Sequence, residues 1–200
     1  FRNSAASYTV SLLQPKVIRD MELARHGLKV VLRKRDNFLP GEGDYLLSGR
    51  GGLTRKEIKR LNPADAEGYD RYIAELETVV PLVRKWILRS PPESGAGLRG
   101  LPSLLSLGRD LAGLSTAEVR AVHDFATRSA GDVLDRHFTG DLAKALFGFD
   151  GIVGNFASPY DSGSAYVLLH HLFGEAAGVE GAWGHAIGGM GSITQAMARA

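Results

Sequence analysis

The sequence contains no cysteine among its 200 residues. This absence excludes a disulfide scaffold, a thiol nucleophile and any zinc or iron–sulfur site with cysteine ligands. Histidine does not supply a substitute, because no His-x-x-x-His pair occurs and the adjacent His170 and His171 would point about 100° apart on a helix. We therefore expect no metal site, and any redox chemistry must come from a bound organic cofactor.

The sequence also lacks an excess of charge of either sign. With 24 basic and 22 acidic residues, it offers no electrostatic basis for binding nucleic acid. The basic clusters at 33–35 and 55–60 are interpreted as solvated faces. No apolar run approaches the roughly 18 residues of a membrane span, and no signal peptide is visible. These features favour a cytoplasmic location and leave peripheral contact with a membrane open.

Several signals of a complete chain and of familiar enzymes are missing. The sequence begins at Phe1 rather than Met, and a helix predicted after residue 191 reaches Ala200 without a stop signal. We interpret the chain as an internal piece of a longer polypeptide. No Gly-x-Ser-x-Gly elbow of a hydrolase occurs. Neither 49–52 nor 188–191 has the full spacing and context of a dinucleotide-binding loop.

The pattern that is present predicts an α+β fold, mainly helical with a small sheet. Residues 1–52 are rich in strands and loops, 53–150 form a helical insert, and 151–200 form a glycine-rich return to the sheet. In the first segment, we expect a helix over 16–27. The alternation of Leu28, Val30 and Leu32 predicts a strand, 36–44 has turn composition, and 45–47 is expected to return as the second strand of a hairpin.

Helix start signals punctuate the middle segment. Thr54 and Ser115 each precede a glutamate by three residues, as in a capping box, and Asn62 followed by Pro63 is typical of a helix start. Thr139 is expected to cap a further helix. One apolar stripe at helical spacing is interpreted mainly as core, and Pro81 is expected to kink or split its helix. The stripe comprises Tyr69, Tyr72, Ile73, Leu76, Val79, Val80, Val83 and Trp86.

Glycine and aromatic residues are concentrated in the last quarter. Tyr160, Tyr166 and Trp183 lie among glycines rather than on a regular stripe, so we expect them to line an apolar pocket. Gly188 and Gly189 would let the backbone approach a ligand closely, with Met190 and His185 nearby. The alternative is a plain turn from loop to helix.

Two blocks of sequence resemble phytoene-dehydrogenase-like flavoproteins, and in particular their NAD(P)/FAD-dependent oxidoreductase branch. The first block covers 8–28 and resembles the stretch shortly after the nucleotide-binding strand. The second, WGHAIGGMGSITQAM at 183–197, resembles the turn and helix that precede the strand completing the FAD site. The order of the two blocks, with a helical insert between them, matches across essentially the whole chain.

This resemblance implies an amine-oxidase-like, two-domain FAD-dependent fold of which the chain would supply most of the substrate domain. The pyrophosphate-binding loop is then expected upstream and the segment closing on the flavin downstream. Ser7, Tyr8, Gly188, Gly189 and Met190 would contact FAD. An apolar substrate, oxidised or desaturated by hydride transfer to the flavin, would lie near Tyr160, Tyr166, Trp183 and His185. No catalytic base is assigned, and the piece alone is expected to be inactive.

Two other functions stay open from the sequence. The first is a non-enzymatic helical binding module, whose apolar face would serve a partner. The second is an amine oxidase with an aromatic cage around an amine. The substrate, electron acceptor and oligomeric state are not determined by the sequence.

Overall fold

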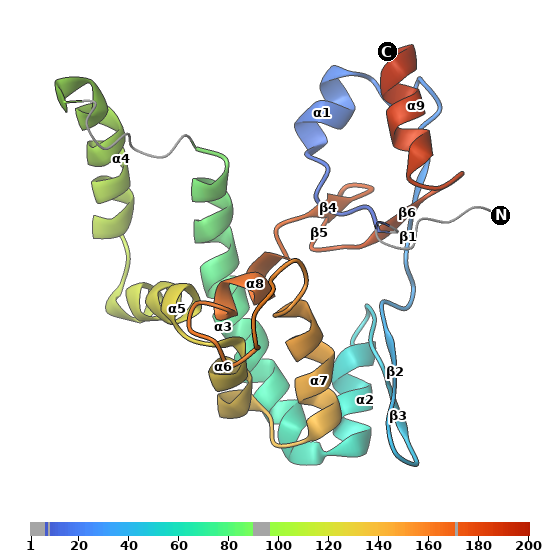
Figure 1. Cartoon of the computed structure of the whole chain (residues 1–200), viewed down its shortest axis with the longest axis vertical. Coiled ribbons are helices and arrows are strands. Elements are labelled where there is room, and N and C mark those ends of the chain that lie inside the picture. The colour runs from blue at the N-terminus through green and yellow to red at the C-terminus, as the bar shows by residue number, and fades with distance from the viewer. Residues whose placement is uncertain (1–6, 8, 90–96, 171) are drawn as a thin grey trace.

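The computed structural model describes residues 7, 9–89, 97–170 and 172–200. Two parts are visible: a helical body from the middle of the chain, and a smaller terminal lobe built from its first and last segments (Figure 1). The lobe contains α1 (Pro15–Asp20), β1 (Val30–Leu32), β4 (Glu175–Ala176), β5 (Val179–Glu180), β6 (Gly184–Ala186) and α9 (Gly191–Arg199). A hairpin of β2 (Phe38–Pro40) and β3 (Tyr45–Leu47) leads from the lobe to the body.

The terminal lobe is held by pairing between the two ends of the chain. β1 pairs antiparallel with β6, with Val30 opposite Ala186, and Val10 forms a further antiparallel bridge to Gly184. The strands expected near 28–32 and 183–187 are therefore confirmed. The lobe has its own core, which consists of Val10, Leu23, Leu28, Ala186, Ile193 and Ala196.

Two expectations for the first segment are wrong. Residues 45–47 pair with Phe38–Pro40 and not with the strand around Val30, because the turn is confined to 41–44, where the Gly41 amide donates to the Asp44 carbonyl. The first helix ends at Asp20 and not at Gly27. The backbone leaves the helical region at Glu22, whose φ is 45°, and a series of turns fills the stretch up to Gly27.

The helical body confirms the helices expected between 54 and 147. It contains α2 (Leu53–Leu61), α3 (Pro63–Ile87), the 3₁₀ turn η1 (Gly97–Gly100), α4 (Leu101–Ala112), α5 (Thr116–Thr127), α6 (Ala130–His137), α7 (Asp141–Asp150) and α8 (Ala165–His170). Within the described part of 53–170 no strand occurs. The core of the body includes Tyr72, Leu76, Val79, Phe125, Val133, Phe138, Leu146 and Leu169.

The helix starts are only partly as predicted. The Asn62 side chain accepts from the Ala64 amide, and Ser115 and Glu118 form the reciprocal capping box, so both of these starts are confirmed. The capping box at Thr54 is wrong, because α2 already begins at Leu53. The Thr54 hydroxyl instead exchanges two hydrogen bonds with the backbone of Gly49.

The start of α7 is held by a buried carboxylate and not by the predicted Thr139 cap. Asp65 of α3 accepts hydrogen bonds from the amides of Thr139 and Gly140, at 2.8 Å each, and from the Thr139 hydroxyl. A carboxylate at this position also suits the positive end of the α7 dipole. Asp65 therefore fixes α7 against the start of α3.

The apolar stripe of α3 is mostly core, as predicted, with one exception. Tyr72, Leu76, Val79 and Val80 are buried, whereas Trp86 is half-buried and belongs to neither core. The helix runs through Pro81 without being split. The stripe expectation therefore fails only at its C-terminal end, at Trp86.

Candidate functional site

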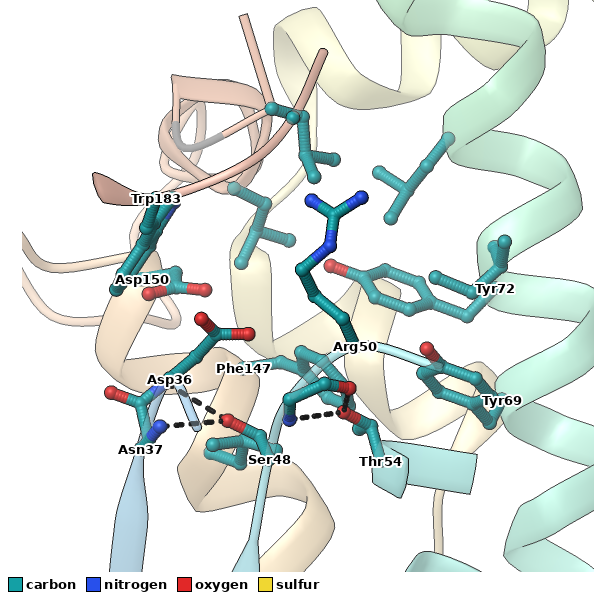
Figure 2. Close-up of a pocket in the computed structure, with 17 residues that line it drawn as sticks. Asp36, Asn37, Ser48, Arg50, Thr54, Tyr69, Tyr72, Phe147, Asp150 and Trp183 are labelled. Carbon is teal, nitrogen blue, oxygen red and sulfur yellow. Dashed lines mark hydrogen bonds between the residues drawn. The ribbon is translucent and has the colours of Figure 1, made fainter. Parts of the chain in front are cut away.

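A cavity of about 230 Å³ lies where the helical body meets the hairpin and the terminal lobe (Figure 2). We call it the central cavity. It is lined by Asp36, Asn37, Ser48, Gly49, Arg50, Thr54, Tyr69, Tyr72, Ile73, Leu76, Leu146, Phe147, Asp150, Leu168, Leu172, Gly181 and Trp183. Each of the three segments distinguished in the sequence, 1–52, 53–150 and 151–200, contributes residues to this lining.

Aromatic side chains form much of the wall. Tyr69 and Tyr72 come from α3, Phe147 from α7, and Trp183 from the segment entering β6. The Tyr72 and Phe147 ring centroids are 5.1 Å apart. Burial raises the pKa of the Tyr72 hydroxyl far above its usual range, so Tyr72 stays neutral and can only donate or accept hydrogen bonds. Such a wall suits an apolar ligand.

Two carboxyl groups lie beside Trp183. Asp150 is the last residue of α7, its Oδ1 is buried, and desolvation raises the pKa of its carboxyl to about 7. Partial burial also raises the pKa of Asp36, although the charges of Arg33 and Arg50 act in the opposite direction. Figure 2 shows both carboxyls on the same side of the cavity as Trp183. This side can hold or release a proton near neutral pH.

Arg50 is the positively charged residue of the cavity lining. Figure 2 shows its side chain extending from the hairpin side into the cavity, toward Tyr72 of α3. The residue as a whole is exposed, so the cavity is open to solvent where the arginine enters. The cavity thus combines an apolar wall, two carboxyls and one guanidinium.

The predicted substrate residues lie in different places. Trp183 lines the central cavity. Tyr160 lines a separate surface cavity of about 380 Å³, where its hydroxyl donates to Asp135. Tyr166 is exposed and packs against the Phe173 ring, and His185 lies on the outward face of β6, 3.5 Å from the Arg33 guanidinium. The structure therefore does not bring these four residues together around one ligand site.

The predicted flavin residues gather at the far end of β6. Gly188 and Gly189 have φ values of 89° and 82°, and Met190 precedes the first residue of α9. The antiparallel bridge at Val10 directs the chain so that Ser7 lies toward this same end of β6. Tyr8 lies outside the described residues. Trp183 directly precedes β6 and the Gly188–Gly189 turn follows it, so this turn and the Trp183 side of the central cavity lie at opposite ends of the strand.

Three residues of the cavity were not identified from the sequence. Asp36 lies in a stretch interpreted as a turn, Arg50 in a glycine-rich loop, and Asp150 at the end of an apolar helix. The only sequence signal for this site was that an acidic residue, Asp150, ends the apolar helix around Leu146. It points to a site only once the fold places it beside Trp183.

Within the described residues, the structure contains neither a candidate metal site nor a helix that could span a membrane. Among the residues placed by the structure, no group of three or more histidine or acidic side chains could hold a metal ion. In the same part of the chain, no helix has both the length and the apolar character needed to cross a bilayer.

Comparison with known proteins gives relatives but no matching family profile. The chain is 33% identical, over 218 aligned positions, to mouse and rat proteins named pyridine nucleotide-disulfide oxidoreductase domain-containing protein 2. It is 26% identical to an uncharacterized protein of Mycobacterium bovis over 208 positions. The alignments cover 99% of the chain but only 37% of the two rodent proteins. These relatives support a pyridine nucleotide-disulfide oxidoreductase family and not phytoene dehydrogenases specifically.

Proposed function

We propose that the chain is the substrate-binding part of an FAD-dependent oxidoreductase of the phytoene-dehydrogenase-like type. Its substrate would be an apolar organic molecule that loses a hydride to the flavin. The observation that carries this proposal is the aromatic-walled central cavity, to which the glycine-rich return contributes Trp183. The rodent relatives, whose name contains an oxidoreductase domain, support the same class of chemistry.

The residues of the Gly188–Gly191 turn fit a contact with FAD, although they do not fit its pyrophosphate. Positive φ at Gly188 and Gly189 requires glycine, and the turn opens the nine-residue helix α9. A pyrophosphate cradle needs a strand, a Gly-x-Gly-x-x-Gly loop and a helix. Residues 95–100, GAGLRG, have that spacing, but the element described before them is the helix α3. The cradle is therefore proposed to lie outside this chain.

FAD and the residues of this chain would have separate roles in the proposed reaction. FAD, when bound, would supply the hydride acceptor. The chain would hold the flavin edge at the Gly188–Gly191 turn and orient the substrate between Tyr72, Phe147 and Trp183. Aromatic walls also exclude water from the reacting bond.

The experiment that tests this proposal replaces Gly189 by valine in the intact oxidoreductase. The β-branched side chain is strained at a φ of 82° and would block close backbone approach, so we expect FAD retention to weaken by about tenfold or more. Equilibrium dialysis against FAD measures the change.

The matched control is Gly178→Val. Gly178 has a φ of 78° in the β4–β5 turn, and a Cβ there would meet no atom within 4 Å. This variant carries the same type of backbone strain away from the proposed flavin contact and should retain FAD as the wild type does. Equal losses in both variants would refute a specific role for Gly189.

A further inference from the structure

The guanidinium of Arg50 enters the central cavity, where its charge opposes the rise that burial causes in the pKa of Asp36, without forming a direct ion pair. Within the described residues, no Asp or Glu oxygen lies within 4 Å of it, and it donates no hydrogen bond. Several other arginines in the body do form ion pairs: Arg55 with Asp70, Arg60 with Asp44, Arg84 with Glu180 and Arg136 with Asp124. Arg50 therefore brings a positive charge to the cavity that acts on Asp36 from a distance but forms no ion pair among the described residues.

The backbone around Arg50 is anchored, so the side chain is presented from a defined position. Two hydrogen bonds with the Thr54 hydroxyl hold Gly49, and a Cβ at Gly49 would lie 2.8 Å from the Lys34 carbonyl oxygen. The next two residues, Gly51 and Gly52, have φ values of 67° and 76° and turn the chain into α2. The backbone is therefore fixed, and the planar guanidinium loses less entropy per hydrogen bond than a flexible ammonium group when it binds an anion.

The residues around the Arg50 guanidinium determine which kind of anion can bind there. Ile73, Leu76, Leu168 and Leu172 belong to the lining and cannot hydrogen-bond to it. Beside apolar walls, a planar carboxylate that accepts two parallel hydrogen bonds is the strongest partner for arginine. The two carboxyls beside Trp183 would repel a ligand with a second negative charge.

We propose that the central cavity binds an apolar molecule with a single carboxylate, held by Arg50, with its apolar body between Tyr72 and Trp183. This inference rests on the proposed function, because it names the substrate class of the same cavity. It assigns Arg50 a role in binding and specificity. Neither carboxyl beside Trp183 forms an ion pair with Arg50 among the described residues, so the guanidinium can bind a ligand carboxylate.

The test is a binding titration that needs no flavin. A Trp86→Phe background leaves Trp183 as the only tryptophan, so its fluorescence reports on the cavity. Octanoate, 1-octanol and octylamine share the same apolar chain and differ in their head group. We expect octanoate to bind about tenfold or more tighter than octanol.

The variants assign this preference to Arg50. In Arg50→Gln, octanoate and octanol should bind within about twofold of each other, whereas Arg50→Lys should keep part of the preference. Arg71→Gln is the matched control, because Arg71 is an exposed arginine of α3 outside the cavity lining. Circular dichroism of each variant verifies the fold, and the lysine variant serves if the glutamine variant does not fold.

Three outcomes would overturn the inference: no preference for octanoate, equal losses in the Arg50 and Arg71 variants, or tightest binding of octylamine. The last outcome would indicate an amine substrate held by Asp36 and Asp150. FAD binding is measured separately. A protein that binds FAD but not octanoate contradicts the inference alone, and one that binds octanoate but never FAD contradicts the proposed function.

Discussion

The substitution Asp150→Asn is expected to stabilise the protein at pH 8 by roughly 2–4 kcal/mol, since each pKa unit corresponds to about 1.4 kcal/mol. Burial raises the pKa of Asp150 from 3.8 to about 7 in the folded protein. Between these two pH values the folded state binds more protons than the unfolded state, so the free energy of unfolding falls as the pH rises. Above pH 7 the full free-energy cost of burying the charged Asp150 carboxylate is present. Asparagine removes the charge and this cost.

Urea unfolding at pH 4 and pH 8 measures the effect. The gain should be near zero at pH 4, where the wild-type carboxyl of the folded protein is already protonated. Asp141→Asn serves as control, because Asp141 is exposed in the first turn of the same helix and should change stability by less than about 1 kcal/mol. A loss of stability at pH 8 in Asp150→Asn would show that the carboxylate is satisfied in the fold.

Gly68→Ala is expected to destabilise the protein by about 2 kcal/mol or more. A Cβ at Gly68 of α3 would lie 1.8 Å from the carbonyl oxygen of His137, the last residue of α6. Because the obstacle is backbone, the two helices must move apart, and overpacking of this kind costs about 1–3 kcal/mol or more. Alanine regains only about 1 kcal/mol through its better helix propensity. The movement would also displace Tyr72, which contacts the His137 ring and lines the cavity.

Gly108→Ala provides the comparison, with thermal or urea unfolding as the measurement. Gly108 is exposed in α4, and a Cβ there would meet no atom within 4 Å. That variant should be neutral or more stable by up to about 1 kcal/mol. If both alanine variants gain stability, the close approach of α3 and α6 is not a constraint on the fold.

The features that could be predicted from the sequence are those set by local interactions. The capping box at Ser115 and the Asn62–Pro63 start depend on residues within one helical turn, and both are confirmed. The partner of β1 could not be found in this way, because β6 is far away in the sequence and a short strand carries no signal of its partner. For the same reason, the cap of α7 was assigned to Thr139 when Asp65 supplies it.

The candidate site was predictable only in part. Trp183 was expected to line a pocket and does so, because an aromatic residue among glycines rarely forms part of a regular stripe. Tyr72 was placed in the core, which is correct, but its ring also faces the cavity. Asp150 and Arg50 acquire their properties from tertiary packing, which buries the Asp150 carboxyl and places the Arg50 guanidinium in the cavity.

The visible absorption spectrum of the full-length protein, purified and then titrated with FAD, tests the proposed flavin chemistry most directly. We predict the bands of an oxidised flavin at about one FAD per chain, and only weak FAD binding by the 200 residues alone, because we propose that the pyrophosphate cradle lies outside them. A colourless intact protein that ignores added FAD would contradict the account, as would a stoichiometric flavin spectrum from these 200 residues alone.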